Sequence, residues 1–305
     1  MTDSRSLLSG IITPLCTPLD ENLEVDVESL TKLVEFQLDA GVDALFMLGS
    51  SGEVTFLTDS QRDLVINTAV RVARGSAPVL AGVLDGGTVR VIEHARRAAR
   101  LGADAIVTVG PTVSTHASEV ANHFRQIANA IDLPQVIYNI GATRVEVPLV
   151  EELVDDGSVA AIKDSTGDTT ALRRLIAIRN ENPDFTMATG SELLVDVAFL
   201  MGATGAVPGL ANVDPHSYVR LAGLCAAGKW EEARELQDRL IRLFDIQLTA
   251  DPATTGSSSS FRGGIKSALA LRGIIKTNAT TRPHRQLGES EVGAVSVVLE
   301  ELGLI

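Results

Sequence analysis

The sequence is poor in several residue types, and each shortage excludes a class of protein. Only two of its 305 residues are cysteines, Cys16 and Cys225, which is too few for a framework of disulfide bonds. Aromatic residues make up 4% of the chain, so its hydrophobic core has to be built mainly from Val, Ile, Leu and Ala. The apolar fraction of 45% is nevertheless ordinary for a globular protein with a large core.

Positive charge is also scarce. The chain has 26 lysines and arginines against 39 aspartates and glutamates, a net charge of −13, and its basic residues form no cluster. Proteins that bind nucleic acid neutralise phosphates with clustered lysine and arginine. We therefore expect no nucleic acid among the partners of this protein.

Long apolar runs are missing as well. No stretch of about 18 apolar residues is present that could form a membrane-spanning helix. The opening residues, MTDSRSLLSGIITPL, lack the basic and apolar segments of a signal peptide. These observations predict a cytoplasmic protein that has no contact with a membrane.

Short apolar segments rich in β-branched residues alternate along the chain with amphipathic segments. Continuous apolar segments are typical of parallel strands that are buried on both faces. In the amphipathic segments apolar residues recur at helical spacing, as at Leu30, Leu33, Val34 and Leu38. We expect strands at 10–15, 44–49, 78–83, 104–109, 134–139, 159–164, 185–190 and 204–209, and helices at 27–40, 59–73, 88–101, 118–131 and 169–180.

Eight strands, each followed by a helix, predict an α/β fold of the (β/α)8 TIM-barrel type. The alternative, an open doubly wound sheet, normally carries a glycine-rich turn after its first strand, where this chain has prolines in GIITPLCTPLDEN. We expect a barrel over 1–213 that carries the active site, and a C-terminal helical extension over 214–305. In the extension we expect helices at 215–228, 230–248, 262–275 and 289–302, and a flexible loop at 251–260.

Lys163, in VAAIKD, stands at a predicted strand end, where TIM-barrel enzymes carry their reactive groups. It is one of only five lysines, and the only one that follows an apolar strand core. Desolvation there disfavours the ammonium form and makes an amine available for condensation with a ketone. The alternative is a structural lysine that pairs with Asp164 or another carboxylate.

Tyr138 ends the strand before that of Lys163 and is one of only two tyrosines. Neighbouring strands lie about 5 Å apart, so its hydroxyl could exchange a proton with the same small molecule. The alternative is a residue that only caps the core. The other tyrosine, Tyr218, falls on a predicted helix, where we expect it to pack.

The segment GSSGE, residues 49–53, directly follows the second predicted strand. Its glycines let backbone N–H groups turn toward an anion, and the hydroxyls of Ser50 and Ser51 add donors. No lysine follows as in a P-loop, so the segment suits a single carboxylate better than a diphosphate. The alternative is an ordinary turn.

The five histidines are scattered along the chain. His116 and His123 could share a helix face, but no third ligand is near them in the sequence. We therefore expect no metal site, and no motif indicates a cofactor.

Taken together, ITPL, GSSGE, YN, IKDSTGD and GATGAVPGLANVDP resemble the dihydrodipicolinate synthase and N-acetylneuraminate lyase superfamily, over nearly the whole chain. The resemblance implies Schiff-base-forming class I aldolases on a (β/α)8 barrel, which usually form tetramers. It implies that Lys163 forms the imine, that Tyr138 transfers protons, and that Ser50 and Ser51 bind the 2-oxo acid carboxylate. It also implies that the main-chain carbonyl of Val207 faces the site.

The chain departs from the dihydrodipicolinate synthases of that superfamily at two places. They carry paired tyrosines after the fourth strand, where this chain has Thr112 and Val113, and an arginine for a second carboxylate, where it has Thr143. Arg144 is displaced by one residue from that place. The resemblance therefore leaves the substrate contacts of Thr143 and Arg144 open.

The segment TGSELL, with Gly190 and Glu192, falls where the sugar-acid lyases of the superfamily bind hydroxyl groups. This favours a lyase or aldolase that acts on pyruvate or a 2-oxo acid, such as a 2-keto-3-deoxy sugar acid. The alternatives are dihydrodipicolinate synthase itself, with Arg144 moved into place, and a degenerate barrel that binds a 2-oxo acid without turnover. In each case we expect a small-molecule ligand and a homo-oligomer, a tetramer or a dimer.

Overall fold

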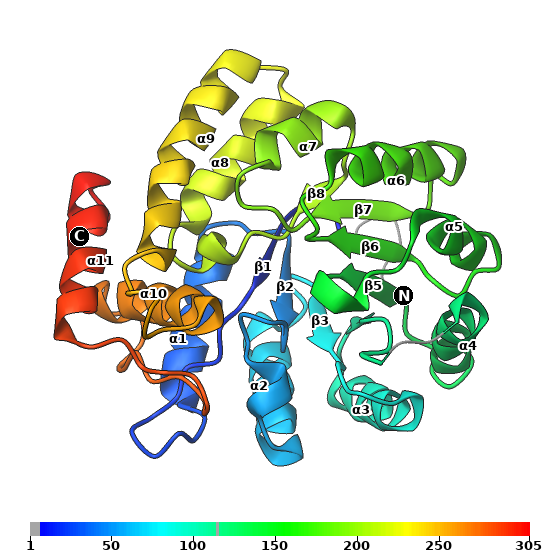
Figure 1. Cartoon of the computed structure of the whole chain (residues 1–305), viewed down its shortest axis with the longest axis horizontal. Helices are drawn as coiled ribbons and strands as arrows, with labels where there is room; N and C mark the ends of the chain where they lie inside the picture. Colours follow the sequence, from blue (N-terminus) through cyan, green and yellow to red (C-terminus); the bar gives the residue numbers. More distant parts are fainter. Residues whose placement is uncertain (1–6, 114–115) are drawn as a thin grey trace.

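The computed structural model describes residues 7–113 and 116–305. Eight parallel strands form a closed barrel in sequence order, and β1 pairs with β8 to complete the circle (Figure 1). The predicted (β/α)8 fold with a C-terminal helical part is therefore confirmed. The strands are β1 (Gly10–Pro14), β2 (Ala44–Met47), β3 (Val79–Gly82), β4 (Ala105–Thr108), β5 (Gln135–Asn139), β6 (Ala161–Asp164), β7 (Thr186–Thr189) and β8 (Gly205–Ala206).

A ring of helices covers the outside of the barrel (Figure 1). Each of the five helices predicted between the barrel strands agrees with an observed helix to within three residues at either end. The last of the ring, α8, contacts both α7 and β1. The helices are α1 (Val27–Asp39), α2 (Asp59–Ala73), α3 (Thr88–Leu101), α4 (Ala117–Ala128), α5 (Val147–Asp155), α6 (Thr169–Glu181), α7 (Val195–Met201) and α8 (Pro215–Ala226).

Local sequence signals mark where several helices begin. The side chain of Asp168 accepts hydrogen bonds from the backbone N–H groups of Thr170 and Ala171 at the start of α6. Thr58 and Gln61 form a capping box at the start of α2. These caps end the loops before α2 and α6 at a defined residue, which helps to hold both loops in place at the C-terminal ends of the strands.

Beyond the ring, α9 (Trp230–Phe244), the short 3₁₀ helix η5 (Asp245–Gln247), α10 (Ser257–Leu271) and α11 (Glu289–Glu301) form a helical part beside the barrel (Figure 1). The boundary at residue 213 stays a prediction. The prediction of a flexible loop at 251–260 is wrong in its second half, because α10 already begins at Ser257. Tertiary packing overrides the poor helix propensity of serine here: Ser260 is buried, and its hydroxyl donates a hydrogen bond to the carbonyl of Gln247.

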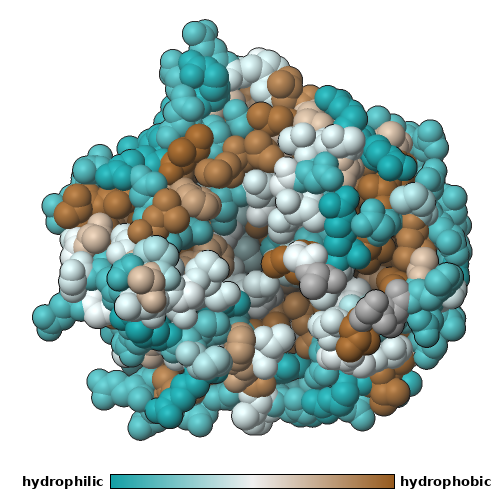
Figure 2. Space-filling model, viewed as in Figure 1, coloured by the Kyte–Doolittle hydropathy of each residue, from teal (hydrophilic) through white to brown (hydrophobic). Residues whose placement is uncertain are grey.

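Among the described residues, no helix is long and apolar enough to cross a membrane. One face of the molecule is hollowed near the centre of the view in Figure 2, over the barrel. That hollow is the opening of the cavity described next.

Candidate active site

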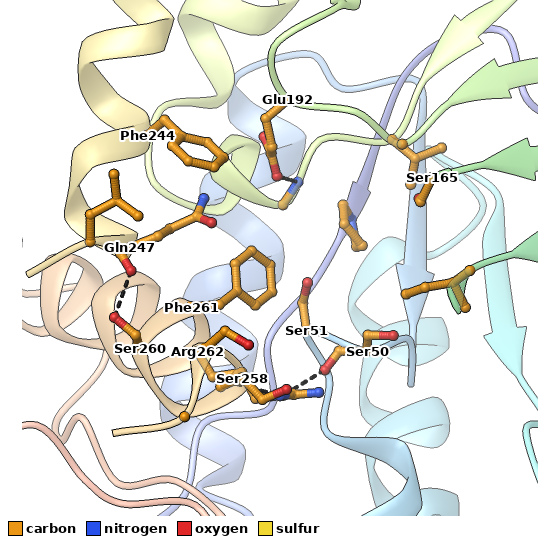
Figure 3. Close-up of a pocket in the computed structure, with 18 of the residues that line it drawn as sticks. Ser50, Ser51, Ser165, Glu192, Phe244, Gln247, Ser258, Ser260, Phe261 and Arg262 are labelled. Atoms are coloured by element: carbon orange, nitrogen blue, oxygen red, sulfur yellow. Dashed lines mark hydrogen bonds between the residues drawn. The ribbon is translucent and has the colours of Figure 1, made fainter. Parts of the chain in front are cut away.

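A cavity of about 720 Å³ opens at the C-terminal ends of the strands. The barrel supplies one wall, and the chain from the end of α9 to the first turns of α10 supplies the other (Figure 3). Seven of the nine predicted site residues line it. The lining residues are Pro14, Ser50, Ser51, Tyr138, Ile140, Lys163, Ser165, Gly190, Glu192, Val207, Gly209, Phe244, Gln247, Leu248, Ala250, Pro252, Thr255, Gly256, Ser257, Ser258, Ser260, Phe261 and Arg262.

Lys163 lies on β6 directly opposite Tyr138 on β5, and its side chain is only 5% exposed. Its Nζ atom lies 4.2 Å from the centre of the Tyr138 ring and 5.2 Å from that of Phe46. Within the described part of the chain it forms no ion pair. Asp164, the alternative partner, instead accepts a hydrogen bond from the backbone of Thr166. Lys163 is thus held against two aromatic rings without an ion-pair contact in the described residues, and Glu192 of the same cavity acts on it only through its charge.

Gly190 gives the lysine side chain its room. A Cβ atom at this position would lie 2.8 Å from Cε of Lys163 and closer still to the hydroxyl of Ser165. Any larger residue would therefore push against the lysine. Gly190, which directly follows the neighbouring strand β7, therefore leaves space for the Lys163 side chain.

Tyr138 and Ser50 meet in the cavity. The Tyr138 hydroxyl lies 3.3 Å from Oγ of Ser50, a hydrogen bond in which either atom can donate. The next residue, Ser51, is almost fully buried and also faces the cavity (Figure 3). The GSSGE segment therefore brings two hydroxyl groups to the same place as the phenol and the amine.

A buried ion pair holds the end of that segment. The carboxylate of Glu53 pairs with the ammonium of Lys266 on α10, and both side chains are fully buried. Burial raises the pKa of Glu53, but the charge of Lys266 and two hydrogen bonds from Thr281 outweigh it and hold the pKa below its ordinary value. The Glu53 backbone is left-handed, with φ of 59°, so the turn depends on these contacts.

Glu192 lies on the opposite side of the cavity (Figure 3). Its carboxylate accepts hydrogen bonds from the backbone N–H groups of Gly209 and Leu210 and from the hydroxyl of Tyr218. Burial raises the pKa of Glu192 to about 7 despite these bonds. Tyr218 is fully buried, as expected for packing, but it also orients this carboxylate.

The remaining predicted residues divide into two groups. Val207 lines the cavity, whereas Thr143 and Arg144 do not. The hydroxyl of Thr143 donates to the carbonyl of Ile140, and Arg144 forms ion pairs with Glu146 and Asp168. The substrate contacts of Thr143 and Arg144 stay predictions.

The second wall of the cavity contains no residue that the sequence analysis predicts for the site. Phe244, Gln247, Phe261 and Arg262 all face it (Figure 3). No local motif marks these residues, because tertiary packing brings them to the barrel: α9 contacts α7 and α8, and α10 packs against η5. The serine run before Phe261 is the only signal of polar function in that stretch.

Metal ligation has no candidate in the described part of the chain, where no group of three or more His, Cys, Asp or Glu side chains could hold an ion. His123 instead bonds to the hydroxyl of Thr88 and the carbonyl of Val109. The reactive groups that converge here are an amine, a phenol, hydroxyls and one carboxylate.

A TIM barrel with an unpaired lysine and a phenol at the mouth is the arrangement of a Schiff-base-forming enzyme. Comparison with known proteins agrees: the chain belongs to the Dihydrodipicolinate synthetase family, which matches residues 7–302. It is therefore a lyase of the class I aldolase type that acts on pyruvate or another 2-oxo acid through a Schiff base.

Three similar proteins illustrate the match. The chain is 30% identical over 304 residues to a 4-hydroxy-tetrahydrodipicolinate synthase from Pelobacter propionicus, and the alignment covers 98% of this chain and 100% of the relative. YagE from E. coli K12, solved in complex with pyruvate, superposes with a TM-score of 0.91 at 26% identity and covers 98% and 100% of the two chains. A monomeric dihydrodipicolinate synthase variant also has a TM-score of 0.91 at 26% identity, with 100% of both chains covered.

Proposed function

We propose that Lys163 is the residue that forms the Schiff base. The observation that supports this most strongly is its position: a nearly buried amine, opposite Tyr138, that faces a cavity and has no carboxylate partner in the described residues. Its Nζ attacks the 2-oxo carbon, the carbonyl oxygen leaves as water, and a C=N bond replaces the C=O bond. In cleavage the protonated imine accepts the electron pair of the breaking C–C bond and becomes an enamine. In condensation the enamine returns that pair to the carbonyl carbon of the incoming aldehyde, and the imine forms again.

The neighbouring groups have separate tasks in this proposal. Ser50 and Ser51 bind the carboxylate of the 2-oxo acid through hydroxyl and backbone N–H donors. Tyr138, 3.3 Å from Ser50, takes the proton from the substrate hydroxyl that becomes the aldehyde carbonyl in cleavage and returns a proton to that oxygen in condensation. The main-chain carbonyl of Val207 and the space at Gly190 complete the surroundings of the imine.

For the substrate we propose a 2-keto-3-deoxy sugar acid or a similar 2-oxo acid. The cavity of about 720 Å³ has room for more than pyruvate, and Glu192 can accept hydrogen bonds from substrate hydroxyls. The arginine with which a synthase holds a second carboxylate has no counterpart among the cavity residues at this place, where Arg144 is paired with Glu146 and Asp168. Cleavage would release pyruvate and an aldehyde.

The second candidate is condensation of pyruvate with aspartate semialdehyde. The relatives with this name support it, at 30% identity over 304 residues for that of Pelobacter propionicus. The position of Val113, where a synthase tyrosine is expected, speaks against it, because this side chain is apolar and 65% exposed.

Reduction with borohydride tests the proposal. Incubation with pyruvate and borohydride should add about 72 Da to the protein, on Lys163 by peptide mapping. An adduct on another lysine, or none with pyruvate or any keto-deoxy sugar acid, would overturn it. Release of pyruvate from a sugar acid selects the aldolase, and consumption of aspartate semialdehyde selects the synthase. Binding of pyruvate without any turnover would select a degenerate barrel.

We further propose a cytoplasmic homo-oligomer. The family to which the chain belongs supports this, because its members usually assemble into oligomers. Sedimentation equilibrium tests this: a single species with the mass of one chain would contradict it.

A further inference from the structure

Arg262 is a cation in the cavity that the proposed function leaves without a task. It lies on α10 and faces the cavity close to Ser50 (Figure 3). Of the 23 residues that line the cavity, only Lys163 and Arg262 are lysine or arginine, and only Glu192 is acidic. In a protein with a net charge of −13, this cavity is locally rich in positive charge.

Every hydrogen bond of the Arg262 guanidinium goes to a neutral acceptor. Its Nε donates to the carbonyl of Ser50 over 2.8 Å, and one Nη donates to the carbonyl of Ser258 over 3.1 Å. The same Nη donates to Nε2 of His284, whose Nδ1 faces the carbonyl of Thr281. Within residues 7–113 and 116–305 the other Nη donates no hydrogen bond.

The nearest carboxylate does not compensate this charge. Glu53 lies close enough to act on Arg262, but it is paired with Lys266 and accepts two hydrogen bonds from Thr281. The three groups together carry one positive charge. A partly buried cation without a contacting anion is unfavourable, and a bound anion relieves that cost.

Arg144 is placed differently from Arg262. It forms ion pairs with Glu146 and Asp168 and does not line the cavity. The first carboxylate of a 2-oxo acid is already assigned to Ser50 and Ser51. The free Nη of Arg262 is therefore available to a different acidic group.

We propose that Arg262 binds a second acidic group, a carboxylate or a phosphate, at the end of the substrate away from the imine. The substrate class is then a 2-oxo acid with a terminal anion, or pyruvate with an anionic aldehyde. This inference rests on the proposed function for the position of the imine and for the assignment of the first carboxylate to Ser50 and Ser51. The guanidinium is fixed on three sides before the substrate arrives, so little side-chain freedom is lost on binding.

Matched 2-oxo acids test the proposal. The concentrations that half-saturate borohydride trapping at Lys163 are measured for pyruvate, 2-oxoglutarate and its neutral 5-amide, and for a 2-oxo acid that ends in a phosphate. In the wild type we expect an anionic end to bind about 10- to 100-fold more tightly than the amide, since charge-assisted hydrogen bonds have that strength. Arg262→Gln should remove this preference, and Arg262→Lys should retain part of it. Arg234→Gln, an equal charge loss on the exposed face of α9, is the control.

Two results would overturn the proposal: a wild-type enzyme that does not distinguish the anionic probes from the amide, or an Arg262→Gln variant that weakens all probes equally. The second would mean that Arg262 only positions the Ser50 backbone. If the phosphate probe is preferred over the dicarboxylate and Arg262→Gln removes that preference, the proposal holds and the terminal group is a phosphate. Failure to trap pyruvate at all would instead count against the proposed function, and calorimetry with 2-oxoglutarate and its amide would still test Arg262.

Discussion

Two lysines of this chain are buried, and their surroundings are opposite. Lys163 is 5% exposed and lies against the rings of Tyr138 and Phe46. Lys266 is fully buried, pairs with Glu53 and donates a 2.7 Å hydrogen bond to the carbonyl of Ala279. The first side chain ends in a cavity and the second ends in the protein interior.

The difference shows that burial alone does not make a lysine reactive. The Lys266 ammonium is held by two fixed acceptors, the Glu53 carboxylate and the carbonyl of Ala279, and it does not line the cavity. Lys163 lies against two aromatic rings at the cavity and forms no ion pair among the described residues, so in our proposal its Nζ is free to form a covalent bond with a bound ketone. The chain thus uses one buried lysine to hold the GSSGE segment and the other, in our proposal, to hold the substrate.

The largest effect should follow from removing Lys163. Lys163→Ala should abolish trapping of pyruvate because no amine remains at the strand end, and intact mass after borohydride measures this. Wild-type far-ultraviolet circular dichroism in the variant excludes misfolding. An adduct that persists in Lys163→Ala would contradict the assignment of the Schiff base to Lys163 rather than to another lysine such as Lys266.

Removal of the phenol tests the group opposite Lys163. Tyr138→Phe keeps the ring against Nζ and should lower kcat by about 10²- to 10⁴-fold, the usual contribution of a general acid–base group. Trapping of pyruvate should persist, because the amine is untouched. A loss of trapping as large as the loss of turnover would assign Tyr138 to imine formation instead.

For Lys266 we expect loss of stability. Lys266→Met leaves the Glu53 carboxylate buried without its partner and should lower the free energy of unfolding by about 3–5 kcal/mol. The double variant Glu53→Gln with Lys266→Met should recover most of this loss, and urea unfolding measures both. If Lys266→Met unfolds like the wild type, the ion pair does not hold the segment.

The smallest effect concerns the pH dependence of Glu192. Its pKa rises from 4.5 to about 7 on folding, so the folded state binds more protons between these values. The stability from the protonated carboxyl is present below pH 4.5 and is lost as the pH rises through 7. Glu192→Gln should flatten the pH dependence of urea unfolding in this range. A profile identical to that of the wild type would contradict the raised pKa.

Much of the barrel could be predicted because its signals are local. The alternation of strands and helices follows directly from the sequence, because apolar segments predict buried strands and the amphipathic segments between them predict helices, as at β6 and α6. Lys163 and Tyr138 could be singled out because each polar residue ends an apolar strand. The start of α10 at Ser257 could not be predicted, because the burial of Ser260 against Gln247 outweighs the low helix propensity of serine.

The sequence by itself determined the order of strands and helices, the family, and the residues that stand at the strand ends. Only the tertiary structure decided that Arg144 turns away to Asp168 and that Arg262, more than 200 residues after Ser50, comes to the cavity. The physical reason is that spacing along a strand or helix follows from local backbone geometry, whereas contacts between distant segments depend on how their surfaces pack.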